Sequence, residues 1–318
     1  MLRIGLVGTS SISERFADAV AQVHGVELSR VSSRDERTAR AFAARVGAPG
    51  VAVGLDALLA AGDVDAVYLA SPNSVHAPQV RAAVDAGIPV LVEKPAVLTA
   101  DEWDAAVSHA RDRGVVLLEA MRTAYDPGLA AVAAAMTRVG TVRRVALRYE
   151  KRSARYDQVL AGEQTNILDP AMGGSALRDL GVYPLHALVR LCGAPRSVHG
   201  ARVGIASGTD GAGSALAVYD GFVADIAWSK ITDTALPSEI QGEEGSLVID
   251  AIDAPRRLVL TPHGGPSEVI EVEAAENIMV GEVERFRDAV AGADIAEDQR
   301  LTGLTLRLVD EILGVPLT

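Results

Sequence analysis

The sequence predicts an α/β fold in which a doubly wound parallel sheet is followed by an α+β domain built on a largely antiparallel open sheet. Two observations predict this architecture. Up to about Met121, short apolar runs alternate with longer amphipathic stretches, which is the pattern of repeated β-α units. From about Thr141, extended stretches follow one another without intervening helices, which is typical of antiparallel pairing. We place the boundary near Met121–Pro127 and expect domains at residues 1–121 and 122–318.

In the first domain, several expected strands are continuous apolar runs, as in a parallel sheet with helices on both faces. These strands are Leu2–Val7, Val26–Ser32, Asp65–Ala70, Pro89–Glu93 and Val115–Glu119. The helices expected between them are Ile12–Val23, Glu36–Val46, Leu55–Ala61, Val75–Ala86 and Ala100–Arg113.

In the second domain, eight extended stretches are expected, and Asp220-Gly221 between two of them is a strong hairpin signal. The stretches are Val142–Glu150, Ser197–Ile205, Ser214–Tyr219, Phe222–Trp228, Ser238–Gln241, Ser246–Ile249, Arg257–Leu260 and Glu268–Val272. The expected helices are Ala176–Leu191, Val280–Val290 and Gln299–Leu313.

The composition excludes several classes of protein. Of 318 residues, 49% are hydrophobic and 23% charged, which is the balance of a folded globular chain. A formal net charge of −12 argues against a nucleic-acid or anionic-membrane partner, since either would favour a basic surface. The single cysteine, Cys192, cannot form an internal disulfide, and no apolar run approaches the roughly 18 residues that would span a bilayer. We therefore expect a cytoplasmic protein.

The loop after the first strand is a candidate phosphate-binding loop. Gly8-Thr9-Ser10-Ser11-Ile12-Ser13 follows the strand and opens a helix, whose first turn offers N–H groups to a pyrophosphate. Only Gly8 matches the G-x-G-x-x-G fingerprint, because Ser10 and Ser13 replace the other two glycines. The alternative is an ordinary strand-to-helix turn in which serines cap the helix.

The end of the second strand indicates which dinucleotide would bind. An acid there would hold the ribose 2′-hydroxyl of NAD, but this chain has Ser32, Ser33 and Arg34, and Asp35 comes one place late. The Arg34 guanidinium can pair with a 2′-phosphate, which favours NADP, with NAD left possible. In the alternative, Ser33 or Asp35 caps the next helix while Arg34 lies in solvent.

Two further loops lie at the carboxyl ends of strands, where ligands bind in such sheets. Ser71-Pro72-Asn73-Ser74-Val75-His76 is rich in hydrogen-bond donors beside a helix start. In Glu93-Lys94-Pro95, the proline restricts the backbone of Lys94, which can orient a hydroxyl, polarise a carbonyl or move a proton. The alternatives are turn and capping roles for Asn73 and His76, and a solvated loop lysine for Lys94.

In the second domain, Asp179, Tyr183 and His186 share one face if the segment is helical, because they are four and three residues apart. Pro184 removes one helical hydrogen bond and is expected to kink the segment. An Asp–Tyr pair in an otherwise apolar helix is either a satisfied structural pair or part of a site.

Taken together, these pieces resemble the Gfo/Idh/MocA oxidoreductases, and the resemblance runs from the first strand to the last helix. The matching pieces, in order, are Ile4-Gly5-Leu6-Val7-Gly8, Ser71-Pro72-Asn73 with His76, Glu93-Lys94-Pro95, Glu119-Ala120-Met121, and Gly173-Gly174-Ser175-Ala176-Leu177 leading to Asp179-Leu180-Gly181-Val182-Tyr183. The resemblance implies an N-terminal Rossmann domain and a C-terminal domain whose open sheet often forms the subunit interface.

The resemblance also implies the chemistry. The lysine of the family's E-K-P motif is catalytic, which carries that role to Lys94. Tyrosine at position 183, where many members have histidine, is similar to the branch of dihydrodiol dehydrogenase, xylose dehydrogenase and glucose–fructose oxidoreductase. That branch implies oxidation of a sugar or cyclic diol hydroxyl, with Tyr183 as acid/base, Lys94 orienting the oxygen and Asp179 positioning the substrate or Lys94. The opposite assignment, with Lys94 as the proton acceptor, stays open, and His186 is expected to be structural.

We expect an NADP-dependent enzyme that has no metal and works as a homodimer or homotetramer. The expected cofactor contacts are Gly8, Thr9, Ser10, Ser11, Ile12, Ser33, Arg34, Ser71, Asn73, His76, Glu93 and Lys94, and the Lys94–Pro95 peptide is expected to be cis. Two rival functions are a non-catalytic NADP-binding regulator and a sugar–sugar oxidoreductase that keeps its nucleotide bound.

Overall fold

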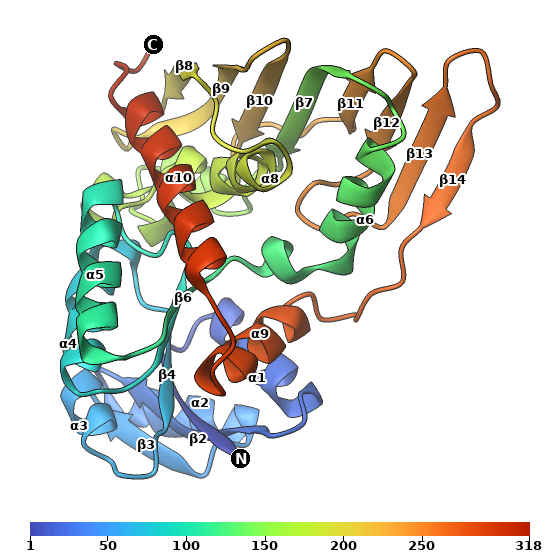
Figure 1. Ribbon diagram of the computed structural model, residues 1–318. Helices are drawn as coiled ribbons and strands as arrows, with labels where there is room; N and C mark the ends of the chain where they lie inside the picture. The colour runs from blue at the N-terminus through green and yellow to red at the C-terminus, as the bar shows by residue number, and fades with distance from the viewer. The chain divides into compact units, whose positions relative to one another are not determined.

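The structure is a computed structural model that describes residues 1–318, and the chain divides into two compact units. The first comprises residues 1–122 and 275–303, and the second residues 123–274 and 304–318. Each unit is built on one sheet (Figure 1). No helix is both long and apolar enough to cross a membrane.

The first unit is a six-stranded parallel sheet in the order β3-β2-β1-β4-β5-β6. Its strands are β1 (Leu2–Val7), β2 (Val26–Ser33), β3 (Gly50–Val53), β4 (Ala66–Leu69), β5 (Val90–Glu93) and β6 (Leu117–Ala120). The strand order reverses between β1 and β4, so their carboxyl ends form the crevice where doubly wound sheets bind ligands.

Helices cover this sheet because each parallel crossover carries one. They are α1 (Ser11–Gln22), α2 (Glu36–Val46), α3 (Leu55–Leu59), α4 (His76–Asp85), preceded by a short turn η1 (Asn73–Val75), and α5 (Ala100–Arg113). Helix α1 packs beside α2, and α4 and α5 lie side by side (Figure 1). Strands β4, β5 and β6 are buried along their whole length, as predicted from their apolar runs.

Residues 275–303 belong with the first unit, which the expected boundaries of 1–121 and 122–318 did not anticipate. They include α9 (Val280–Val290), which packs on α1, and the first part of α10 (Ala296–Leu313). Trp103 of α5 donates from its indole to the Gln299 carbonyl at 2.9 Å, and the Gln299 amide donates to the Leu117 carbonyl at 3.0 Å. These are long-range contacts that no local sequence pattern reports.

The second unit is an eight-stranded, mostly antiparallel sheet in the order β14-β13-β12-β11-β7-β10-β9-β8, in which only β7 and β10 pair in parallel. Its strands are β7 (Val142–Glu150), β8 (Ser197–Gly204), β9 (Asp210–Val218), β10 (Val223–Ser229), β11 (Ser238–Gly242), β12 (Gly245–Ile249), β13 (Arg257–Pro262) and β14 (Glu268–Glu271). The predicted hairpin turn at Asp220-Gly221 joins β9 to β10, and Gly221 has the positive φ of 85° that such a turn requires.

One face of this sheet is buried and the other is not. Helix α6 (Pro127–Met136) packs on β12, and α8 (Val182–Cys192) packs on β7 and β10 (Figure 1). The inward residues alternate with outward ones, as the two-residue repeat of a strand requires; Ile226 and Trp228 are fully buried. On the opposite face, Leu216 is 39% and Val203 47% exposed.

Candidate active site

The loop between β1 and α1 has the geometry of a strand-to-helix phosphate loop despite its two serines. Gly8 has a φ of 112°, and a Cβ there would lie 2.5 Å from the Ala70 carbonyl oxygen, so only glycine fits. Ser10 occupies the N-cap position of α1, but its side chain makes no capping bond. Instead its hydroxyl lies 3.3 Å from that of the buried Ser13. Serine capping, the alternative reading of this loop, is therefore not observed at Ser10.

The end of β2 separates the roles of its polar residues. Asp35 caps α2: its Oδ1 accepts the Thr38 N–H at 2.8 Å and the Thr38 hydroxyl at 2.6 Å. These hydrogen bonds, that of the hydroxyl first, lower the pKa of the Asp35 carboxyl. Ser32 donates to the Gly54 carbonyl at 2.9 Å, and Arg34 is exposed. The Asp35 carboxylate thus caps α2, and the Arg34 side chain is exposed at the carboxyl end of β2.

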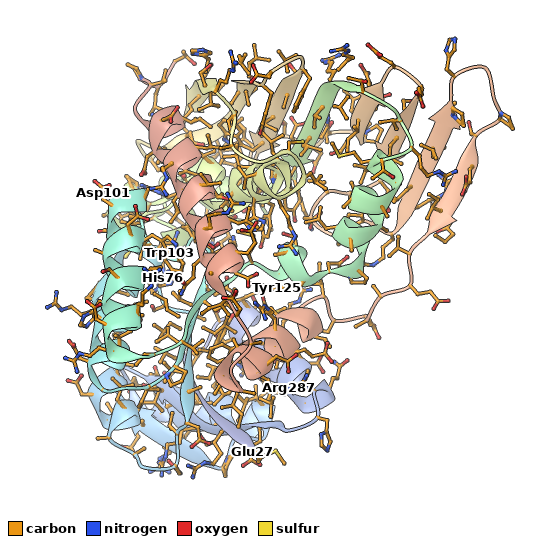
Figure 2. All side chains as sticks on the ribbon, in the orientation of Figure 1. Glu27, His76, Asp101, Trp103, Tyr125 and Arg287 are labelled. Atoms are coloured by element: carbon orange, nitrogen blue, oxygen red, sulfur yellow. The ribbon has the colours of Figure 1, made fainter.

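His76 links the loop after β4 to the loop after β5. Its imidazole, labelled in Figure 2, is fully buried, with Nδ1 3.0 Å from the Pro95 carbonyl oxygen and Nε2 2.9 Å from that of Ser71. Burial lowers the pKa of this ring, so it stays neutral and donates to one of the two carbonyls. The expected cofactor contact of His76 stays a prediction, and in the structure the ring holds these two main-chain carbonyls. Beside it, the Ser71 hydroxyl donates to the Gln79 side chain at 2.6 Å.

The Glu93-Lys94-Pro95 turn ends β5, and its Lys94–Pro95 peptide is cis, as predicted. Glu93 is 8% exposed: its Oε1 accepts the Tyr68 hydroxyl at 2.5 Å, and its Oε2 accepts the Lys94 N–H at 3.1 Å. Tyr68 in turn stacks on Phe16 of α1, with ring centroids 3.6 Å apart. Glu93, also expected to contact a cofactor, thus fixes the main chain of the turn from which the half-buried Lys94 projects.

Two more buried carboxyls lie in the first unit. Glu119 of β6 accepts the Ala96 N–H at 2.9 Å and the Thr302 hydroxyl at 3.0 Å, and burial raises its pKa to about 7. Glu282 of α9 is fully buried with no hydrogen bond to either carboxyl oxygen. Burial first, and then the charge of Glu93, raise the pKa of Glu282 well above its usual range.

In the second unit, Asp179 and Tyr183 lie on a helix that begins with a π-helical turn. This turn, η5 (Leu177–Gly181), runs directly into α8. The kink expected from Pro184 therefore takes the form of a wider, π-helical turn on the N-terminal side of that proline. Gly181 lets the segment approach the sheet, since a Cβ there would lie 3.0 Å from the Trp228 ring. Tyr183 is 4% exposed and meets the Tyr149 ring edge-on at 5.6 Å.

Lys230 is a polar residue at this site that sequence reasoning missed. It follows β10, its side chain is 6% exposed, and its ammonium donates to the Asp179 carboxylate. The only signal in the sequence is a lysine two residues after Trp228, near the end of the predicted strand, and exposed strand ends commonly carry lysine. His186, expected to be structural, is buried with a pKa lowered by burial to about 3.

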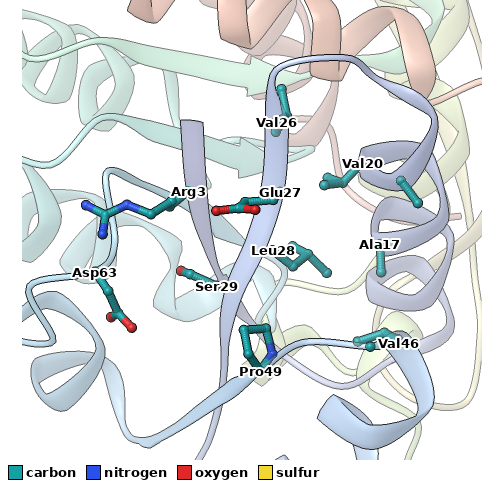
Figure 3. Close-up of a pocket in the computed structure, with 12 residues that line it drawn as sticks. Arg3, Ala17, Val20, Val26, Glu27, Leu28, Ser29, Val46, Pro49 and Asp63 are labelled. Carbon is teal, nitrogen blue, oxygen red and sulfur yellow. The ribbon is translucent and has the colours of Figure 1, made fainter. Parts of the chain in front are cut away.

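Other features lie away from these residues. A hollow of about 530 Å³ opens between α1, β2 and the loop after α2, and Arg3 and Glu27 line it (Figure 3). These residues stand at the amino ends of β1 and β2, the edge of the sheet opposite the Gly8 loop. No group of three or more His, Cys, Asp or Glu side chains is placed to hold a metal ion.

Comparisons with known proteins cover almost the whole chain. Residues 2–121 match the Gfo/Idh/MocA oxidoreductase family with its NAD-binding Rossmann fold, and residues 131–248 match the family's C-terminal domain. The chain is 36% identical over 286 residues to the NADP(+)-dependent scyllo-inositol 2-dehydrogenase of Bacillus subtilis, covering 90% of this chain and 87% of that protein. It is 33% identical to a dTDP-3,4-didehydro-2,6-dideoxy-alpha-D-glucose 3-reductase of Streptomyces violaceoruber, covering 80% and 74% of the two chains.

Solved structures agree on the fold. A 3-ketoreductase from Actinomadura kijaniata, crystallised with NADP and TDP-benzene, superposes with a TM-score of 0.88 at 23% identity, covering 98% of this chain and 97% of that one. The aldose-aldose oxidoreductase of Caulobacter crescentus superposes with a TM-score of 0.86 at 19% identity, covering 98% and 96%. Both domains match the family, and one relative is 36% identical over 90% of this chain. The chain therefore belongs to the Gfo/Idh/MocA family of oxidoreductases.

Proposed function

We propose that this protein is an NADP-dependent dehydrogenase that transfers a hydride between a hydroxyl of a sugar or cyclic polyol and the nicotinamide. The observation that carries the proposal is the Glu93-Lys94-Pro95 turn in the first unit together with Asp179 and Tyr183 in the second, within a chain of this oxidoreductase family. The B. subtilis relative, named as an NADP(+)-dependent scyllo-inositol dehydrogenase, supports the cofactor and the substrate class.

The residues of the first unit fit a dinucleotide. The first turn of α1 receives no capping bond from Ser10, so its N–H groups can serve the pyrophosphate, and the Ser10 and Ser13 hydroxyls lie beside it. Arg34 is the group for a 2′-phosphate, and Thr38 holds the Asp35 carboxylate at the start of α2. The other expected contacts remain part of this proposal, namely Gly8, Thr9, Ser11, Ile12, Ser33, Ser71, Asn73, His76, Glu93 and Lys94.

Bound NADP would supply the hydride acceptor at the carbinol carbon. In our proposal, Tyr183 takes the hydroxyl proton, and Lys94 orients the same oxygen with its ammonium. A cation near the phenol favours the phenolate, which would otherwise cost about 4 kcal/mol at pH 7. Asp179 accepts a hydrogen bond from a substrate hydroxyl and so orients the ring. The opposite assignment, with Lys94 as the proton acceptor, is the alternative.

The test is a cofactor-reduction screen with purified protein. NADP+ and NAD+ are each offered with scyllo-inositol, myo-inositol, D-xylose, D-glucose and a cyclic diol, and reduced nucleotide is followed by its absorbance. We expect multiple turnovers with NADP+ and at least one of these polyols. Reduction that stops after one equivalent, without release of nucleotide, would instead indicate a sugar–sugar oxidoreductase. Nucleotide binding without any reduction would refute the proposed activity.

We further propose that the protein is a dimer through the outer face of the eight-stranded sheet. Leu216 and Val203 are exposed on this face, and Leu216 pairs with Asp225, whose carboxylate forms an ion pair with Arg144 at 2.7 Å. Apolar side chains interspersed with charges on a broad sheet suit a self-complementary two-fold contact.

A further inference from the structure

We propose that Lys230 is a positioning residue, which fixes the Asp179 carboxylate for the reaction while touching neither substrate nor cofactor. The inference rests on the proposed function, and it adds a residue that lies outside the Lys94, Asp179 and Tyr183 set.

The contact is direct, and both partners are sheltered from solvent. The Lys230 Nζ donates to Asp179 Oδ2, and the two side chains are 6% and 20% exposed. The main chain of Lys230 is held on both sides: its N–H donates to the Gly211 carbonyl at 2.8 Å, and its carbonyl accepts the Ser153 N–H at 2.8 Å. The main chain at Lys230 is therefore fixed, and the burial of its side chain limits the positions that its ammonium can take.

The turn that carries Asp179 is fixed at other points as well. The Asp210 carboxylate accepts the Leu177 N–H at 2.9 Å and the Trp228 indole N–H at 3.1 Å, which ties the start of η5 to the sheet. Gly181 sits against the same indole at the end of the turn. These contacts place the backbone of η5, whereas the Lys230 contact acts on the Asp179 side chain itself.

Stability alone gives a weak reason for such a pair. Bringing two charges out of water costs free energy that their attraction only partly returns, and apolar replacements of similar volume are often as stable. What the pair does supply is direction: the Lys230 ammonium holds one oxygen of the Asp179 carboxylate and so restricts the rotation of that side chain.

The experiment compares Lys230→Met, Lys230→Arg and wild type on the polyol found in the screen. Because a displaced positioning group can cost on the order of 100-fold in rate, we expect Lys230→Met to lower kcat by about 10- to 100-fold with a much smaller change in KM for NADP. Lys230→Arg should restore most of the loss, since a guanidinium can still donate to the carboxylate. Arg196→Met, which removes an exposed ion pair in the same unit, is the matched control and should leave kcat unchanged.

A coupling measurement separates positioning from a structural role. If Lys230 acts through Asp179, then Lys230→Met in an Asp179→Asn background should cause little further loss of kcat. Wild-type kcat in Lys230→Met would overturn the inference. The inference would also be overturned if Lys230→Met and Lys230→Arg lost activity equally and both had a lowered Tm. Absence of turnover by wild type in the whole screen would count against the proposed function, before Lys230 is tested.

Discussion

Replacement of the buried Glu119 by glutamine should make the first unit more stable at high pH. Glu119 is 2% exposed, and burial raises its pKa from the usual 4.5 to about 7. In the unfolded chain, the Glu119 carboxyl loses its proton near its ordinary pKa of 4.5. Between pH 4.5 and about 7, the folded chain therefore binds one proton more than the unfolded chain. Stability from this group is therefore fully present below pH 4.5 and is lost as pH rises through about 7. Glutamine has no such titration.

The size of the effect follows from that interval. Each pH unit across it corresponds to about 1.4 kcal/mol in the free energy of unfolding, and the whole interval to about 3 kcal/mol. The glutamine oxygen can still accept the Ala96 N–H, and its amide can donate to Thr302, so the variant should lie close to wild type at pH 4.5. By pH 8 it should be more stable than wild type by about 3 kcal/mol.

The assay is urea unfolding at several pH values, followed by the fluorescence of Trp103, which lies buried in the same unit. A Trp228→Phe background removes the second tryptophan from the signal. Thr302→Val is the companion variant: it deletes a hydrogen bond that lowers the pKa of Glu119, so its pH-dependent loss of stability should start at the same pH but continue to higher pH. A stability difference between Glu119→Gln and wild type that stays constant from pH 4.5 to 8 would refute this reasoning.

Three further predictions concern the nucleotide, the fold and the assembly. Arg34→Ala should weaken NADP binding roughly 10- to 100-fold, the loss of one charge-assisted contact to phosphate, and leave NAD unchanged in parallel titrations, with Arg37→Ala as control; equal loss of both nucleotides would reject the role of Arg34. Arg256→Met should lower the free energy of unfolding of the second unit by about 3 kcal/mol, because it leaves the buried Asp126 carboxylate, 2% exposed and bonded to Arg256 at 2.8 Å, without its partner. The control is Arg257→Met, which removes the exposed ion pair with Glu271, and an equal loss of stability there would count against burial as the cause. Light scattering at micromolar concentration should give a dimer that Leu216→Glu converts to monomer, and a monomeric wild type would reject the proposed interface.

The alternation of apolar runs and amphipathic stretches was enough to predict both sheets. The predicted strands of the first sheet lie within about two residues of the observed ones, because parallel strands buried on both faces leave a strong apolar signal. Three helices or strands were missed. Strand β3 is an edge strand with only one buried residue, α6 is so uniformly alanine-rich that it shows no polar face, and α7 (Tyr156–Leu160) has only five residues.

The candidate site was predicted residue by residue, and the structure adds the hydrogen-bond partners of several of these residues. Asp35 was left between capping and ribose binding, and Thr38 decides for capping. The expected cofactor contacts of His76 and Glu93 stay predictions, and the structure adds that their polar atoms meet main-chain groups and Tyr68. Lys230 was not foreseen, because a sequence reports that a lysine is present but not which distant carboxylate it meets.

The measurement that tests the central claim most directly is a double-mutant cycle on Lys94 and Tyr183 in single-turnover reduction of NADP+. If both side chains act on one hydroxyl in one step, Lys94→Met and Tyr183→Phe should each lower the rate by at least about 100-fold. The double variant should then be little slower than the worse single variant. Binding of NADP, measured on the same samples, should be largely intact in all three. Near-normal reduction by either single variant, or losses that multiply in the double variant, would contradict the account.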